Sequence, residues 1–417
     1  MDELQGDEFT QDYQSIQNSQ YSHFTFVPEN IMMNEEGNNE NKEMKMLENE
    51  MKMKTLKKEE RKSFLEEKKK SYFQEPFRVI FDMFLVDSFK YRTKNHEYYL
   101  LSHFHSDHYE GITKKWSHGR IIGTEITLKC LQKDFQIPNQ YLITIEYNTP
   151  MIILGKYDEE YSITALNAGH APGSCCFLIE NLKEKKKILH VGDFRFDKKL
   201  MKDEGWNKYV KNQNIDILYL DTTYADKQYQ FDSREIVCQQ IANKAWEEMG
   251  NTLIVVGSYK IGKEMVAEEI AKKCNLKIQV TEEKYEYIKI CERDLSLYTT
   301  QKSSLQLRNK NNGLTQLQME LKENGGEYNK VIKIEATGWS KKMKCKGVYN
   351  LKEYSFPYSE HSSFKELIDC YKFVQPKEII PTVPVRNCTS KEVAQLIIKE
   401  SKPKKNTLDL FLKLGGL

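Results

Sequence analysis

The segment 103–108 (HFHSDH) places three imidazoles and a carboxylate within six positions. Zinc and similar ions favour imidazole nitrogen and carboxylate oxygen as ligands. In an extended segment, residues two apart point to the same side, so His103 and His105 can bind one ion together. Asp107 and His108 follow where they suit a second ion. Because three of the chain's nine histidines fall in this short stretch, the segment predicts a metal site that needs further ligands from elsewhere.

Other histidines and acids lie next to segments with the periodicity of strands or helices. They are His170 after 161–167 (YSITALN), Asp193 after 187–191 (KILHV), Asp221 after 215–220 (IDILYL) and His361 before 364–373. Loops at one edge of a sheet converge, which makes these side chains candidates to complete the site. Taken singly, each also fits an ordinary loop, turn or helix cap.

The order of these motifs resembles a known family. HFHSDH, GHAPGS, HVGDFR and LDTTY are similar to the successive motifs of the metallo-β-lactamase fold. VVGSYKIGKE, EATGW, PYSEHSS and IIPTV resemble the β-CASP nucleases, specifically the DNA cross-link repair branch that includes the Snm and Pso exonucleases and Artemis. The match runs from about Phe81 to about Val385. Relatives commonly read NHCPGA where this chain reads GHAPGS, so Ala171 replaces a cysteine beside the retained histidine.

The resemblance implies a site with one or two divalent ions, Zn²⁺ foremost, with Mg²⁺ or Mn²⁺ as alternatives at the second position. The first ion would be held by His103, His105, His170 and Asp193. The second would be held by Asp107, His108 and His361, with Asp193 bridging. Asp221 would support the cluster from outside it. The implied catalytic groups are Asp107, His108, Asp193, Asp221 and His361.

The activity that the resemblance implies is that of a metal-dependent DNA 5′ exonuclease in the nucleus. It would act on 5′-phosphorylated ends in interstrand cross-link or double-strand-break repair, by attack of a metal-bound hydroxide on the phosphodiester. Two alternatives stay open: an RNA-processing β-CASP endonuclease and, in another class, an inactive scaffold that binds DNA ends. RNA-processing relatives carry a further histidine where this chain has Val383, which favours DNA. All seven implied ligands are present, which favours an enzyme.

Recognition of a 5′-phosphate needs hydrogen-bond donors near the ions. Ser362 and Ser363 begin a predicted helix, where unpaired N–H groups and the helix dipole favour an anion. Thr223 and Thr382 follow neighbouring strands, and Lys263 is a candidate contact to a nucleic-acid backbone. Helix capping and turn formation are the competing roles of these residues. Three aromatic residues are candidates either to stack on bases or to pack in the walls: Tyr224, Tyr358 and Trp339.

The alternation of strand-like and helical segments predicts an α/β fold. We expect a four-layer αββα metallo-β-lactamase sandwich with an inserted α/β β-CASP domain. Outer helices are expected over 111–117 and 124–133, and a hairpin over 175–191. The expected division is a charged disordered tail over 1–75, the first part of the sandwich over 76–228, the insert over 229–349 and the returning part over 350–417.

Charge is distributed unevenly along the chain. Residues 1–75 carry six more acidic than basic side chains, and the remainder carries eight more basic than acidic ones. A basic body suits a phosphate-rich partner, here single-stranded or end-containing DNA, and the tail is a candidate contact for repair proteins. No apolar run approaches the roughly 18 residues of a membrane span, so no membrane segment is expected. The protein is also expected to be a monomer. The nine cysteines include no C-x-x-C pair, which predicts reduced thiols.

Overall fold

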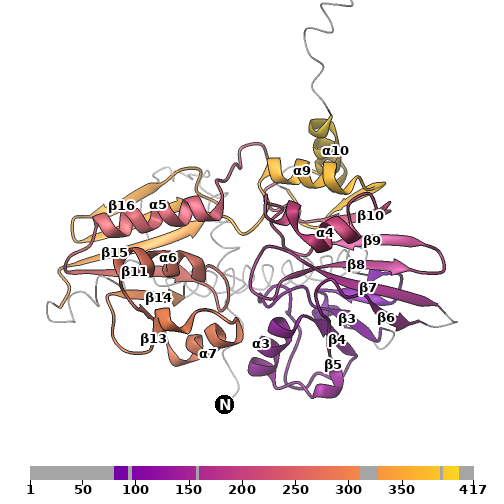
Figure 1. Cartoon of the computed structure of the whole chain (residues 1–417), viewed down its shortest axis with the longest axis horizontal. Helices are drawn as coiled ribbons and strands as arrows, with labels where there is room; N and C mark the ends of the chain where they lie inside the picture. Colours follow the sequence, from indigo (N-terminus) through magenta and orange to yellow (C-terminus); the bar gives the residue numbers. More distant parts are fainter. Residues whose placement is uncertain are drawn as a thin grey trace, which may run out of the picture. The chain divides into compact units, whose positions relative to one another are not determined.

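The computed structural model describes residues 79–92, 96–155, 159–309, 317, 319, 327–385 and 388–402. The tail expected over 1–75 lies outside these residues. The described part contains three sheets with helices packed against them (Figure 1). Within it, no helix is both long and apolar enough to cross a bilayer.

Two of the sheets pack face to face. The first has the order β1 (Val79–Ile80), β2 (Phe84–Val86), β3 (Tyr98–Leu100), β4 (Arg120–Gly123) and β5 (Leu142–Thr144). The second has the order β18 (Glu378–Pro381), β10 (Ile217–Leu220), β9 (Lys186–His190), β8 (Cys175–Asn181), β7 (Glu160–Asn167) and β6 (Met151–Leu154). Phe84, Leu100 and Ile122 of the first sheet share a buried core with Ile163 and Phe177 of the second. The predicted pair of facing sheets and the 175–191 hairpin, formed by β8 and β9, are confirmed.

Helices cover the outer faces of both sheets and complete the four layers. They are α3 (Glu125–Phe135) on the first sheet, and α4 (Glu204–Tyr209), α9 (Phe364–Val374) and α10 (Ser390–Ser401) on the second (Figure 1). Short 3-10 turns occupy Phe89–Tyr91, Asn139–Tyr141, Leu200–Lys202 and Leu295–Leu297. The helix expected over 124–133 is confirmed as α3. The helix expected over 111–117 is wrong, because Gly111 adopts a φ of 102° and the chain makes turns there.

The third sheet belongs to the segment that follows Ser233. Its order is β13 (Tyr298–Thr299), β12 (Ile278–Gln279), β14 (Leu305–Asn309), β11 (Thr252–Ser258), β15 (Lys330–Thr337), β17 (Leu351–Pro357) and β16 (Lys344–Val348). Its helices are α5 (Arg234–Glu247), α6 (Glu264–Cys274) and α7 (Glu282–Ile290), of which α5 and α6 cover one face (Figure 1). Only the β16–β17 pairing is antiparallel among the described strands of this sheet. The expected boundary at residue 349 lies between these two paired strands, so the sheet continues to Pro357.

Strand register places the candidate ligands at one edge of the sandwich. β9 and β10 are parallel neighbours, with His190 opposite Tyr219. The turns that follow them therefore lie side by side, and these turns carry Asp193 and Asp221. Gly192 has a φ of 57°, and a Cβ atom there would lie 2.8 Å from the Cβ of Ser102, so the turn before Asp193 requires glycine.

An aromatic side chain anchors the loop that holds the first histidines. Phe104 is 1% exposed and stacks on Tyr109 with ring centroids 4.6 Å apart. Its ring centroid also lies 6.3 Å from that of Tyr287 in α7. Because side chains alternate along an extended segment, burying Phe104 on one side directs His103 and His105 to the other.

We expect Phe104→Ala to lower the free energy of unfolding by about 3–5 kcal/mol, since it removes a fully buried ring and leaves a cavity. Urea unfolding in the presence of a chelator measures this without a contribution from bound metal. Trp246→Ala is the matched control, because Trp246 is 53% exposed and its loss should change stability by less than about 1 kcal/mol. Equal losses for the two variants would contradict an anchoring role for Phe104.

Candidate metal centre

One carboxylate oxygen lies at the centre of the candidate site. Oδ2 of Asp193 is 3.3 Å from Nε2 of His108, 3.7 Å from Nε2 of His103, 3.8 Å from Nε2 of His170 and 3.9 Å from Nε2 of His361. These groups come from four separate loops of the chain. The fold therefore gathers imidazoles that are distant in sequence around a single acid.

The ligand atoms form three overlapping groups that share Asp193. His103, His105, His170 and Asp193 form the first, with Nδ1 of His105 2.9 Å from Nε2 of His103. Asp107 and His108 join Asp193 in the second, and Asp221 and His361 join it in the third. Within each group the ligand atoms lie within 4.8 Å of one another. All seven ligands expected from the sequence thus lie together, and their nitrogen and oxygen donors suit a divalent ion such as zinc.

Backbone carbonyls orient two of the imidazoles. Nε2 of His105 lies 3.1 Å from the carbonyl oxygen of Ile261, and Nδ1 of His170 lies 3.0 Å from that of Glu360. A carbonyl can only accept a hydrogen bond, so in each ring this outer nitrogen carries the proton. The inner nitrogen is left with its lone pair toward the cluster, which is the tautomer that a metal ligand needs.

Carboxylates orient two further imidazoles. Nδ1 of His361 lies 2.7 Å from Oδ2 of Asp221, and Nδ1 of His108 lies 2.8 Å from Oδ2 of Asp87. Asp87 also accepts hydrogen bonds from the backbone N–H and the hydroxyl of Ser102. Carboxylate partners of this kind fix ring orientation and increase the basicity of a ligating histidine.

Asp87 was not among the residues predicted from the sequence. It follows directly after β2, just as Asp193 and Asp221 come shortly after strands, so the same pattern could have identified it. It adopts a left-handed φ of 46°, which is uncommon outside glycine and turns its side chain toward Ser102 and His108.

The ionisable groups of the cluster divide into neutral imidazoles and groups that are charged in the absence of a metal. Burial holds the pKa values of His103 and His170 well below the ordinary value, so both rings are neutral at neutral pH. Burial would also lower the pKa of His361, but Asp221 and Asp193 outweigh it and raise this pKa to about 9. Burial would raise the pKa of Asp193, yet His108 and His361 hold it well below its usual range. Two rings are thus ready to ligate, whereas His361 must release a proton.

The residues expected to bind a terminal phosphate lie near the cluster, and each already has a partner. The Ser362 hydroxyl accepts from the N–H of Phe196, and the Ser363 hydroxyl caps α9 by accepting from the N–H of Glu366. The other contacts are Thr223 Oγ1 to Asp221 (2.6 Å), Thr382 Oγ1 to the Leu220 carbonyl (3.1 Å) and Lys263 Nζ to the Ala336 carbonyl (2.9 Å). A hydroxyl has one O–H to donate and phosphate oxygens only accept, so Ser362, which donates to the Phe194 carbonyl, and the two threonines would have to turn their O–H groups to bind a phosphate. A phosphate role for these residues stays a prediction.

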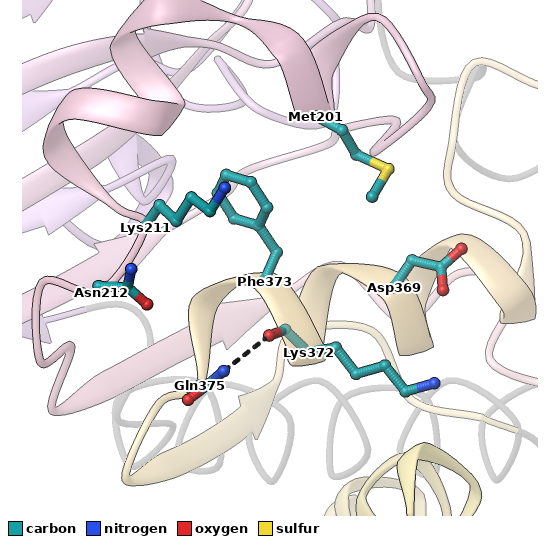
Figure 2. Close-up of a pocket in the computed structure, with 7 residues that line it drawn as sticks. All are labelled: Met201, Lys211, Asn212, Asp369, Lys372, Phe373 and Gln375. Atoms are coloured by element: carbon teal, nitrogen blue, oxygen red, sulfur yellow. Dashed lines mark hydrogen bonds between the residues drawn. The ribbon is translucent and has the colours of Figure 1, made fainter. Parts of the chain in front are cut away.

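A surface hollow of about 280 Å³ lies at the far end of α9 from His361 (Figure 2). Its lining residues are Met201, Lys211, Asn212, Asp369, Lys372, Phe373 and Gln375. Lys211 lies over the ring of Phe373, with Nζ 5.6 Å from the centroid. This hollow has one carboxylate and no histidine, so its chemistry does not match that of the cluster around Asp193.

Asp87→Ala should weaken binding of a divalent ion by about 10- to 100-fold, because His108 loses the carboxylate that orients it. Calorimetric titration of the chelator-treated protein with Zn²⁺ measures this. Asp216→Ala is the control, since Asp216 also borders a strand but pairs with Lys377 at 2.6 Å, away from the cluster. An unchanged affinity in Asp87→Ala would show that Asp87 does not support the site.

The stability of the metal-free protein should decline as pH rises from about 6.5 to about 9, the ordinary and folded pKa values of His361. A group whose pKa is raised by folding stabilises the fold fully below the unfolded value and loses this contribution as pH passes the folded value. Urea unfolding in chelator should therefore show that wild type loses its advantage over His361→Gln across this interval. A difference that is independent of pH would contradict the proposed protonation.

Comparison with known proteins identifies the family. The model of the family described as DNA repair metallo-beta-lactamase matches residues 294–387. The DNA cross-link repair 1A protein of Homo sapiens is 32% identical over 336 residues, which are 76% of this chain and 31% of that protein. The DNA cross-link repair protein SNM1 of Arabidopsis thaliana is 32% identical over 342 residues, 76% of this chain and 67% of that protein. The 5′ exonuclease Apollo of Danio rerio is 28% identical over 310 residues, 73% of this chain and 51% of that protein.

The chain thus spans about a third of the human relative and two thirds of the plant relative. The family expected from the order of the motifs is confirmed, and so is the α/β fold. With its His and Asp cluster at the edge of two facing sheets, the chain belongs to the metallo-β-lactamase/β-CASP family, in the DNA cross-link repair branch.

Proposed function

We propose that this protein is a metal-dependent 5′ exonuclease that acts on 5′-phosphorylated DNA in cross-link or double-strand-break repair. The observation that supports this most strongly is the orientation of the imidazoles around Asp193. His105, His170, His361 and His108 each turn one nitrogen to an outer acceptor and the other toward the cluster. Relatives of this chain are named for DNA cross-link repair and for 5′ exonuclease activity.

In this proposal the cluster holds two divalent ions, and zinc fits its donors best. His103, His105, His170 and Asp193 bind the first, and Asp107, His108, His361 and Asp193 bind the second. Bound there, such ions lower the pKa of a water molecule and offset charge that develops on a phosphate. The protein supplies orientation: Asp221 and Asp87 hold the outer nitrogens of His361 and His108.

The residue at position 383 supports DNA rather than RNA as the substrate. The carbonyl of Val383 accepts a hydrogen bond of 2.6 Å from the hydroxyl of Thr222, next to Asp221. Position 383 therefore lies beside the cluster, where RNA-processing relatives place an additional histidine. An apolar side chain there contributes no ligand, which supports the DNA exonuclease assignment over an RNA endonuclease.

End recognition is assigned to the hydroxyls around α9 and the neighbouring strand ends. Ser362, Ser363, Thr223 and Thr382 would contact a terminal 5′-phosphate, with Lys263 as a more distant contact. The start of α9 favours an anion through its dipole. Preference for a phosphorylated end would follow, because a 5′-hydroxyl offers these groups no charge to bind.

The remaining assignments extend this proposal to the whole chain. We assign residues 76–228 and 358–417 to the metallo-β-lactamase domain and 229–357 to the β-CASP insert, because β17 pairs within the third sheet beyond the boundary at 349 that the sequence suggested. Residues 1–75 are assigned to a tail that contacts repair proteins. The protein would act as a monomer in the nucleus, where its DNA substrate is located.

The test is an incubation of purified protein with end-labelled single strands of DNA or RNA that carry either a 5′-phosphate or a 5′-hydroxyl. We expect stepwise release of mononucleotides from phosphorylated DNA, with cleavage abolished by chelator and restored by Zn²⁺ or Mn²⁺. Asp107→Ala and His361→Ala should each reduce the rate by at least about 100-fold while the circular dichroism spectrum stays unchanged.

Three outcomes would contradict the assignment. Internal cutting of RNA in preference to DNA would favour the RNA endonuclease. Tight binding of DNA ends without cleavage under any metal would favour the scaffold. Cleavage that survives in both His361→Ala and Asp107→Ala would show that the chemistry does not depend on this cluster.

A further inference from the structure

A basic segment lies between β15 and β17 of the third sheet. Residues 339–346, which we call the rim segment, read WSKKMKCK. Its lysines, Lys341, Lys342, Lys344 and Lys346, are all exposed. Among the described residues, only Lys346 of these four forms an ion pair, with Glu353 at 2.7 Å. Three ammonium groups of the rim segment are therefore not neutralised by acids of the described residues.

The rim segment begins at the carboxyl ends of β15 and β17, the ends of these strands that are nearest the metal cluster. β15 and β17 are parallel neighbours, with Thr337 opposite Pro357, and the chain continues from Pro357 to His361. The ring centroid of Trp339 lies 5.2 Å from that of Tyr224, which in turn lies 6.0 Å from that of His361. Trp339 is thus separated from a candidate ligand by one aromatic ring.

Trp339 is mostly exposed, although its ring contacts two other aromatic side chains. Its side chain makes ring contacts with Tyr224 and Tyr229, yet the residue is 66% exposed. The two tyrosines hold the indole in place while much of its surface stays open. The adjacent Gly338 makes this approach feasible, because a Cβ atom there would lie 2.2 Å from the hydroxyl of Tyr224.

Protection of a sheet edge explains only part of this composition. β16 is the edge strand of the sheet, and lysines on an edge strand discourage pairing with another chain. Lys344 and Lys346 lie in β16 and fit that role. Trp339, Lys341 and Lys342 precede the strand, so edge protection does not account for them.

We propose that the rim segment is a track for single-stranded nucleic acid, on which Trp339 stacks against a base while Lys341, Lys342 and Lys344 neutralise phosphates. Aromatic rings interleaved with cations are the usual means of binding single strands without sequence preference. The choice of DNA over RNA as the bound strand rests on the proposed function. The track itself adds a binding surface outside the metal cluster, and it predicts tighter binding of longer strands.

Binding can be measured apart from cleavage. Fluorescence anisotropy in chelator would follow the affinity of labelled 5′-phosphorylated oligodeoxynucleotides of two and of twenty nucleotides. Trp339→Ala should weaken binding of the longer strand by about 5- to 100-fold, the usual range for loss of one stacked base, and Trp339→Phe should recover most of it. The dinucleotide should be little affected by either change.

Salt dependence tests the lysines. Lys341→Gln with Lys342→Gln should reduce the slope of log affinity against log salt by about 0.7 for each phosphate that is no longer neutralised. The matched control is Lys185→Gln with Lys186→Gln, a likewise exposed pair at the start of β9, the opposite end of that strand from His190. If both pairs of substitutions change the slope equally, the lysines of the rim segment act only as general surface charge, and the track is overturned.

The remaining outcomes separate the track from the proposed function. If wild type cuts phosphorylated DNA but Trp339→Ala binds long strands as wild type does, the track fails and the nuclease stands. If wild type binds long strands through the rim segment but cuts neither DNA nor RNA, the proposed function fails and the track stands. A competition experiment tests the kind of partner. If a short polyglutamate of equal charge displaces the strand, and does so to the same extent from wild type and from Trp339→Ala, the rim segment fits an acidic protein partner and the track is overturned.

Discussion

The carboxylate of Asp193 is the interaction on which the site depends. Five histidines lie at this edge of the sandwich, and imidazoles so close together would repel one another once protonated. Asp193 offsets this charge at distances of 3.3 Å to His108 and 3.9 Å to His361. A central carboxylate surrounded by imidazole nitrogens offers the oxygen and nitrogen donors that divalent ions prefer, so the cluster has the chemistry of a metal centre.

The third sheet supports this centre directly. Its loop after β11 supplies the Ile261 carbonyl to His105, and the N–H of Lys263 donates to the carboxylate of Glu360, whose own carbonyl orients His170. Two of the candidate ligands, His105 and His170, are therefore held, directly or through one residue, by the segment inserted into the sandwich. In the proposed function, the insert would therefore support the metal site as well as contact the substrate.

The sequence predicted which histidines and acids lie together better than it predicted the groups that orient them. HFHSDH and the acids after strands were identifiable because ligand chemistry restricts residue type. Backbone carbonyls such as that of Ile261 carry no such signature, since any residue provides one. The turn at Gly111 was missed because an apolar periodicity over 111–117 resembles a helix. Gly111 instead adopts a φ of 102°, and a Cβ atom there would lie only 2.4 Å from the backbone of Lys90. The extent of the third sheet was missed because β16 and β17 pair across the expected boundary.

The position of the insert in the chain explains why it can support the site. The chain leaves the sandwich after Asp221 and returns at His361, and these two side chains are hydrogen-bonded at 2.7 Å. Arg195, buried just after Asp193, donates to the carbonyl of Asp232 before α5 and to that of Ser359 after β17. Both connections to the insert are thus fixed beside the ligands. An insertion with adjacent ends disturbs its host little. The strands β11, β15 and β17 are parallel, and β17 leads to His361. All three strands therefore direct their carboxyl ends, and the rim segment that follows β15, toward the metal cluster.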